Sequence, residues 1–365
     1  MTQVQETELD LEGLRRKIYR RSHSLRSITT FNMTINTFSK FLKEQNLNLE
    51  EVLNKDPYKI LDSFAGWLDE KNYRVSTQRV YLHYVKRIFS HNNIIIDREM
   101  MREKVVIPKK QIFADEPLTP EVARLILLET KNQILRLILC LIKDTVARPS
   151  ELLSLKLSHF NLTHDPPYLT IPAYAAKNDI EREVFFTQET KDLLISYLKD
   201  HKITKQTQHL FLKGNPDPIE DEIGFQRAVE KALVRLEQAW RLVREKPAMK
   251  DIFQPIEQRS IKRAYKIHIY SFKKFAFTKI ADILGDIAAH AIAGHEQYLI
   301  TYYKKTREER AEEYRKIASK LQLFTTPTDI DKKRKELESE VSGLPTEALA
   351  QALILIKTAK KAKKW

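Results

Sequence analysis

The sequence predicts a mainly α-helical fold with a small β-hairpin or sheet, an α+β class, and three observations support this. First, 42% of the 365 residues are hydrophobic and only 7 are glycine, which is typical of an ordered, largely helical chain. Second, apolar residues recur at helical spacing through most of the chain. Third, residues 168–186 change to the composition and alternation of two strands.

Length and charge bound the function. A chain of 365 residues can form two domains with their own cores. Its net charge of +14 and pI of about 9.5 favour an anionic polymer as partner, although ribosomal and membrane-surface proteins are also basic. We expect no membrane association, because no apolar run approaches the roughly 20 residues that span a bilayer, and no signal region opens the chain.

Metal-dependent and nucleotide-dependent chemistry are disfavoured. The sequence has no Cys/His cluster with zinc spacing and no Gly-rich phosphate loop, so we expect no metal site and no cofactor. The one cysteine, Cys140, lies in an apolar run and is predicted to be a small core residue. Together these features predict a cytoplasmic, nucleoid-associated protein.

The N-terminal third predicts a helical domain. Residues 1–22 are polar and are expected to be flexible, and residues 23–104 predict four or five helices. Asp56-Pro57 is a cap and first-turn signal, and Ser76 is expected to cap a third amphipathic helix.

A basic face lies on that third helix. It carries Arg79, Lys86 and Arg87 with Tyr81 and Tyr84 interleaved. The pattern suits contact with a DNA backbone, and an ordinary solvated basic face explains it equally well.

A linker, residues 105–118, separates this domain from a second one at 119–323. Thr119-Pro120 begins the second domain by the same cap logic. An apolar run at 135–142 predicts a buried helix, and a short break then places Arg148 directly before Pro149-Ser150-Glu151. Arg148 therefore lies at a helix entry, where a guanidinium can be held in one place; taken alone, the segment favours an ordinary surface arginine.

The strand-like region predicts a β-hairpin with a lysine near its tip. Residues 168–172 and 183–186 form the two strands, and Lys177 lies in the turn region between them. Such a lysine is usually solvated, but a mobile loop could deliver it to a substrate. Helices are predicted at 188–200, 225–244, 267–283 and 287–293, with residues 246–260 irregular, and then come Gly294-His295 and the pair Tyr302-Tyr303.

These pieces, in this order and spacing, resemble the tyrosine recombinase (phage integrase) family, and most closely the archaeal virus and plasmid integrases. The resemblance covers about residues 25 to 320. It implies a helical core-binding domain at 23–104 and a tyrosine-recombinase catalytic domain at 119–323. The Arg148 segment and the Gly-His…Tyr segment are specific together, whereas each alone is a weak signal.

The family's chemistry gives each residue an implied role. A tyrosine hydroxyl attacks a DNA phosphodiester and forms a 3′-phosphotyrosyl bond without metal or ATP. By match to the motif, Tyr303 is the nucleophile, with Tyr302 as its rival, since the register is uncertain by one residue. Arg148 and His295 bind the phosphate oxygens, and Lys177 is the general acid. Glu151 is the residue that orients the site. The tyrosine pair has an alternative interpretation, in which both rings pack a helix into the core.

One departure from the family's pattern puts activity in doubt. The family's His-x-x-Arg falls at Tyr270-Ser271-Phe272-Lys273, so Tyr270 replaces the histidine and Lys273 replaces the second arginine. Lysine keeps the charge but loses the two-pronged fork that matches phosphate. His268, two residues earlier, is a possible substitute.

Residues 324–365 predict a C-terminal basic tail. Its last helix has an apolar stripe followed by lysines, which suits docking on a neighbouring subunit or on DNA, or folding back on its own domain. The resemblance implies a tetramer on two sites in double-stranded DNA, as an integrase of a mobile element. The alternatives are a DNA-binding protein of the same fold with attenuated chemistry, and a type IB topoisomerase-like enzyme that nicks and closes DNA.

Overall fold

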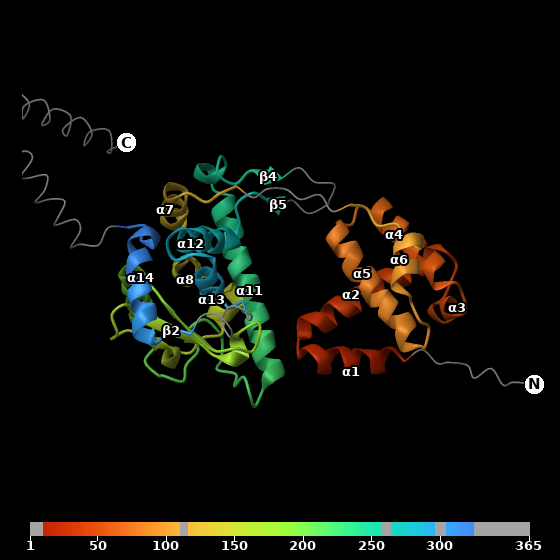
Figure 1. The fold of residues 1–365 in the computed structure, drawn as a ribbon, viewed down its shortest axis with the longest axis horizontal. Coiled ribbons are helices and arrows are strands. Elements are labelled where there is room, and N and C mark those ends of the chain that lie inside the picture. The colour runs from red at the N-terminus through yellow and green to blue at the C-terminus, as the bar shows by residue number, and fades with distance from the viewer. Residues whose placement is uncertain (1–9, 110–115, 257–263, 296–303, 325–365) are drawn as a thin grey trace, which may run out of the picture. The chain divides into compact units, whose positions relative to one another are not determined.

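The computed structural model describes residues 10–109, 116–256, 264–295 and 304–324. The chain divides into two compact units, each built from two stretches of sequence: residues 1–117 with 211–271, and residues 118–210 with 272–365. The described residues are mostly helical, with two small antiparallel sheets (Figure 1). This agrees with the predicted α+β class.

The described residues between 10 and 109 fold into six helices of the first unit. These are α1 (Leu11–Ser22), α2 (Leu25–Glu44), α3 (Leu49–Leu53), α4 (Pro57–Glu70), α5 (Val75–His91) and α6 (Arg98–Lys104). Aromatic rings at helical spacing on α2 and α4 form much of their core: the Phe64 ring centroid lies 5.0 Å from that of Phe38 and 5.2 Å from that of Phe41. Burying each such side chain contributes about 1.5–3 kcal/mol.

Two N-terminal predictions are wrong. Residues 11–22 form α1 rather than a flexible segment, because Leu14 and Ile18 share one helix face and are buried in a cluster with Phe31 and Ile88. Ser76 does not cap α5, which begins at Val75. The predicted cap of α4 is confirmed, since Asp56 accepts a hydrogen bond from the Tyr58 amide at 2.9 Å.

The second stretch of the first unit contains one long helix, α11 (Glu222–Arg244), and a 3-10 turn, Pro247–Met249. Trp240 is buried on α11, with its ring centroid 5.2 Å from that of Phe253. Residues 246–260 were expected to be irregular, but β4 (Pro255–Ile256) pairs with β5 (Ala264–Tyr265) in a two-stranded antiparallel sheet.

The second unit holds the Arg148 segment and the predicted hairpin. Its helices are α7 (Pro120–Glu129), α8 (Gln133–Thr145), α9 (Pro149–Leu153), α10 (Gln188–Asp200), α12 (Ile269–Leu284), which begins at the boundary, α13 (Asp286–Ile292) and α14 (Arg307–Leu321). Thr119 caps α7 as predicted, accepting from the Val122 amide at 3.3 Å. Helix α8 is almost wholly buried and contains Cys140, which is 2% exposed and free.

A three-stranded antiparallel sheet completes the second unit. Its strands are β1 (Phe160–Asn161), β2 (Tyr168–Ile171) and β3 (Arg182–Phe185), in the order β1-β2-β3, and short 3-10 turns lie at Leu157–His159 and Ala173–Ala175. The predicted hairpin is confirmed, with Ile171 opposite Arg182 at the end that leads to the Lys177 turn. Arg307 and Arg310 fasten α14 to β3 through ion pairs with Glu183.

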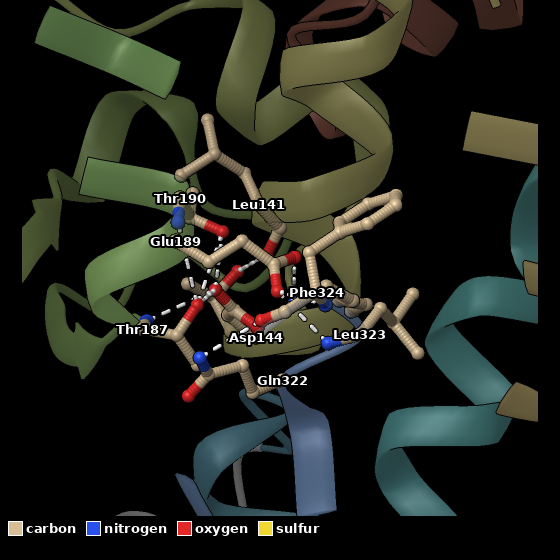
Figure 2. Close-up of polar contacts among 10 residues, drawn as sticks. Leu141, Asp144, Thr187, Glu189, Thr190, Gln322, Leu323 and Phe324 are labelled. Atoms are coloured by element: carbon tan, nitrogen blue, oxygen red, sulfur yellow. Dashed lines mark hydrogen bonds and ion pairs between the residues drawn. The ribbon is translucent and has the colours of Figure 1, made fainter. Parts of the chain in front are cut away.

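A buried polar network joins α8, α10 and the end of the described chain (Figure 2). Asp144 accepts hydrogen bonds from Thr187 and Thr190 and is paired with Lys143 at 2.7 Å. Glu189 accepts from the amides of Leu323 and Phe324, each at 2.8 Å. These bonds satisfy charges that would be costly to bury unpaired.

The described ranges contain neither a membrane-spanning helix nor a cluster of metal ligands. No helix in 10–109, 116–256, 264–295 or 304–324 is long and apolar enough to cross a membrane. In the same ranges, no group of three or more His, Cys, Asp or Glu side chains could hold a metal ion.

Candidate active site

Arg148 lies at the entry of α9, where the sequence predicts it. Its backbone is extended, and its amide donates to Glu151 Oε2 at 2.8 Å, so the carboxylate caps the helix. Its guanidinium donates from Nη1 to Glu151 Oε1 at 2.9 Å. One carboxylate therefore fixes both the backbone and the side chain of Arg148, which supports the predicted role of Glu151 as the orienter.

Arg182 shares this carboxylate, and the sequence-based prediction did not include it. It donates from Nη2 to Glu151 Oε2 at 2.7 Å and from Nη1 to Oε1 at 3.5 Å, and it is 6% exposed. Burial raises the pKa of Glu151, but the charges and hydrogen bonds of Arg182 and Arg148 outweigh it and hold the pKa below its usual range. The carboxylate is therefore ionised at neutral pH and pairs with two guanidinium groups.

A signal for Arg182 is present in the strand alternation. Arg182 and Val184 lie on the same face of β3 and both are buried, while Glu183 between them is partly exposed. A charged residue at an inward-facing strand position is rarely buried without a partner. The partner is Glu151, which is 31 residues earlier in the chain and could not be identified from local pattern.

The Gly294-His295 turn follows α13 and lies directly against Arg182. Gly294 has φ +76, and a Cβ added there would lie 2.6 Å from Arg182 Cζ and 2.7 Å from its Nη1. Asn178, next to Lys177 in the hairpin turn, donates to the Gly294 carbonyl at 3.1 Å. Glycine is required here both for the backbone conformation and for the close approach of the guanidinium.

His295 contacts a second histidine, His290, on α13. Their Nδ1 atoms are 2.5 Å apart, so the ring that carries its proton on Nδ1 donates a hydrogen bond to the other. Burial lowers the pKa of His295, and the charges of His290, Lys273, Arg148 and Arg182 lower it further. The ring is therefore mainly neutral at pH 7, and its contact with His290 was not predicted.

Lys273, on α12, reaches the loop that precedes Arg148. Its Nζ donates to the carbonyl oxygen of Val146 at 2.5 Å. Burial, together with the charges of Arg148 and Arg182, lowers the pKa of Lys273 to about 8, and the Glu151 charge partly opposes this decrease. Lys273 is thus close to the charges of the site, as its alignment with the second arginine predicts. One of its N–H donors, however, is used by the backbone carbonyl of Val146.

Lys177 is exposed in the hairpin turn, as predicted. Its backbone amide is 3.4 Å from Glu151 Oε1, at the long end of hydrogen bonding. The turn therefore adjoins the Glu151 carboxylate through its backbone.

Several predicted residues are not part of this array in the described structure. Tyr302 and Tyr303 lie outside the described residues. Tyr270 is 48% exposed at the start of α12. His268 is engaged within its own turn: its backbone amide donates to Ser271 Oγ at 3.1 Å, and its ring Nδ1 lies 3.3 Å from the same oxygen.

The basic face of α5 is present, but its tyrosines serve the core. Arg79 is exposed, and Lys86 and Arg87 are half-buried. Tyr81 is 6% exposed, and the half-buried Tyr84 donates to the Ser27 carbonyl at 3.3 Å. The lysine and arginines remain candidates for DNA contact, whereas the expected interleaving of tyrosines on the surface is wrong, because Tyr81 belongs to the buried core cluster and the Tyr84 ring packs against Phe31 on α2.

Together, the second unit gathers two guanidinium groups, one ammonium group and one neutral imidazole around a single carboxylate. Fixed cationic donors of this kind stabilise negative charge that develops on a phosphate in a transition state. A histidine and a lysine with lowered pKa values can exchange protons near neutral pH.

Several solved structures resemble this chain in fold. No family model matches the chain, and no curated protein matches it. Among solved structures, XerA recombinase is 16% identical with a TM-score of 0.32, covering 89% of this chain and 96% of that one. The Tn1549 transposon integrase in complex with transposon right-end DNA is 15% identical with a TM-score of 0.49, covering 84% and 98%. A lambda integrase dimer bound to a core site is 13% identical with a TM-score of 0.48, covering 81% and 97%. At these identities and TM-scores, the likenesses carry no argument about activity.

Proposed function

We propose that this protein is a site-specific DNA recombinase, an integrase that cuts and rejoins DNA strands through a 3′-phosphotyrosyl intermediate. The observation that carries the proposal is the shared Glu151 carboxylate, which holds Arg148 and Arg182 at 2.9 and 2.7 Å beside Lys273 and the Gly294-His295 turn. A catalyst that uses neither metal nor nucleotide needs such a preorganised cationic array for phosphoryl chemistry.

In this proposal each residue has one task. Arg148 and Lys273 bind the non-bridging oxygens of the scissile phosphate. His295 also binds a phosphate oxygen and takes part in proton transfer. Tyr303, or its neighbour Tyr302, attacks phosphorus as its hydroxyl proton passes to the neutral His295 ring, and the bond to the 5′ oxygen breaks as Lys177 donates a proton to that oxygen. The free 5′ hydroxyl of a partner strand later attacks the phosphotyrosine and restores the tyrosine.

The remaining parts of the chain have proposed roles as well. Residues 23–104 form a DNA clamp whose basic α5 residues, Arg79, Lys86 and Arg87, contact the backbone. Residues 105–118 link it to the catalytic domain, residues 119–323. The residues from 324 to 365 contribute to assembly of a tetramer on two sites in double-stranded DNA.

One observation favours a second candidate, a DNA-binding protein of the same fold with attenuated chemistry. Lys273 replaces a forked arginine, and its ammonium already donates to the Val146 carbonyl at 2.5 Å. Loss of one preorganised donor costs about 3 kcal/mol, or roughly a hundredfold in rate. The two candidates differ in whether a covalent DNA adduct accumulates.

The test is a search for a detergent-resistant protein–DNA adduct on a supercoiled plasmid that carries the DNA flanking this gene. The natural protein is compared with Tyr303→Phe and Tyr302→Phe. An adduct lost only with Tyr303→Phe identifies the enzyme and its nucleophile. Salt-sensitive binding without an adduct, on a plasmid shown to contain the bound site, supports the DNA-binding candidate. If the protein relaxes a supercoiled plasmid with one site but does not recombine two sites, the result supports topoisomerase-like activity.

A further inference from the structure

Arg182 is held by two residues of the candidate site, Glu151 and Gly294. Glu151 receives its Nη2 at 2.7 Å and its Nη1 at 3.5 Å, and Gly294 lies against the plane of the guanidinium. Its Nε is buried and has no hydrogen-bond partner among the described residues. A flexible arginine is thus confined to one position, at the cost of a buried, unsatisfied donor.

The position of Arg182 connects two halves of the site. On one side, Arg182 fixes the Glu151 carboxylate. That carboxylate in turn fixes Arg148 through the 2.9 Å ion pair and the 2.8 Å helix-cap bond. On the other side, the guanidinium packs directly against the Gly294 backbone and so limits where that backbone can lie. His295 is the next residue in the chain. The hairpin turn closes the arrangement, because Asn178 donates to the Gly294 carbonyl.

We propose that Arg182 is a positioning residue that fixes Arg148 through Glu151 and His295 through Gly294. It also supplies a second fixed guanidinium charge in a site where lysine stands at position 273. The proposal rests on the proposed function for its effect on cleavage, but its structural part, the hold on His295, is independent of DNA chemistry.

A matched control is the arginine that pairs with the next residue of the same strand. Glu183 pairs with Arg307, which is 41% exposed and belongs to the fastening of α14 rather than to the site. Arg182→Lys and Arg307→Lys both keep a positive charge while removing a guanidinium fork from a β3 contact. A general loosening of β3 would affect both variants, whereas a loss of positioning would affect only the first.

The DNA-independent arm follows His295 by NMR. The full chain is labelled with ¹³C at histidine Cε1, and the His295 signal is assigned with His295→Gln. We expect Arg182→Lys to move the His295 pKa or its tautomer-sensitive shift, by about half a pH unit or its equivalent, and Arg307→Lys to leave both unchanged. An unchanged His295 titration in folded Arg182→Lys overturns the proposal.

The DNA arm separates binding from chemistry. At saturating flanking-site DNA, we expect Arg182→Lys to slow adduct formation by about tenfold or more. Its DNA affinity should stay within about twofold, and Arg307→Lys should match the natural protein. Equal adduct rates for the two variants overturn the proposal. If the natural protein forms no adduct, the recombinase function fails, and the His295 titration alone decides the role of Arg182.

Should Arg182→Lys fail to fold, the same contact is changed from its other side. Gly294→Ala places a methyl group against the guanidinium, whereas Gly285→Ala, also at positive φ (+83), meets no atom within 4 Å. A changed His295 signal in Gly294→Ala but not in Gly285→Ala supports the proposal, and equal signals in both overturn it.

Discussion

Lys273 donates a hydrogen bond from Nζ to the carbonyl oxygen of Val146, across 127 residues of sequence, at 2.5 Å. Val146 ends α8 with φ 55 and ψ 17, the left-handed region that β-branched residues rarely adopt. Such a conformation costs on the order of 1–3 kcal/mol and persists only where its surroundings hold it. Lys273 therefore supports the loop that leads directly to Arg148, whatever its contact with a phosphate.

Removal of the Lys273 ammonium should destabilise the fold. We expect Lys273→Met to lower the free energy of unfolding by about 1–3 kcal/mol, because the Val146 carbonyl loses its donor in a buried position. Lys274→Met, at the exposed neighbouring position, is the control and should change stability by no more than about 0.5 kcal/mol. Urea unfolding at pH 7 measures both, and equal stability of the two variants would show that the contact contributes little.

The depressed Lys273 pKa predicts a pH dependence of cleavage. Because this pKa is lowered to about 8, the ammonium loses its proton as the pH rises through that value. The rate at limiting DNA, which reports the free enzyme, should therefore fall above about pH 8. Lys273→Arg should not show this decrease, because a guanidinium stays charged to beyond about pH 12. Initial rates from pH 6 to 10 give the comparison; parallel profiles would assign the decrease to another group.

Neutralising the shared carboxylate should disorder the cationic array. Glu151→Ala leaves Arg182 buried at 6% exposure without its partner, and breaking a buried pair costs about 3–5 kcal/mol. Glu151→Gln keeps the shape and the Arg148 cap acceptor, so a smaller loss of stability is expected. Both variants should form the DNA adduct more slowly than the natural protein. Thermal unfolding and adduct rates test this, and a Glu151→Ala variant as stable as the natural protein contradicts it.

Alanine at the two positive-φ glycines of this region should have unequal effects. Gly285→Ala incurs only the backbone cost, about 1–2 kcal/mol. Gly294→Ala incurs the same cost and also a Cβ contact of 2.6 Å with Arg182 Cζ, so it should be more destabilised by at least about 1 kcal/mol. Denaturant midpoints give the difference directly, and equal values mean that Arg182 moves aside freely.

Elements with local signals could be predicted from sequence. Caps at Asp56 and Thr119 and the hairpin at 168–186 depend on residues within a few positions, so the pattern predicts them. Helix α1 was missed because its charged composition hides the spacing of Leu14 and Ile18, whose burial needs partners on other helices. Val146 adopts a conformation that contradicts its local preference, so no propensity argument could find it.

The candidate site was predictable in part for the same reason. Arg148 and Glu151 are three residues apart, and their cap geometry follows from helix entry. Arg182 and Lys273 reach their partners over 31 and 127 residues, and these contacts depend on the assembled unit. The resemblance supplied an order of motifs, but not the carboxylate that two arginines share.

The amides of Leu323 and Phe324, which Glu189 binds at 2.8 Å each, define where the second unit can be shortened (Figure 2). A chain that stops at Thr326 keeps both donors and should unfold at nearly the temperature of the whole protein. A chain that stops at Gln322 strips them from the carboxylate that also pairs with Lys143 at 3.2 Å, and it removes the Leu323 carbonyl that Arg124 binds at 2.7 Å. It should therefore unfold several degrees lower than the chain that stops at Thr326, by differential scanning calorimetry, because the stability of the second unit depends on the four residues that separate the two ends.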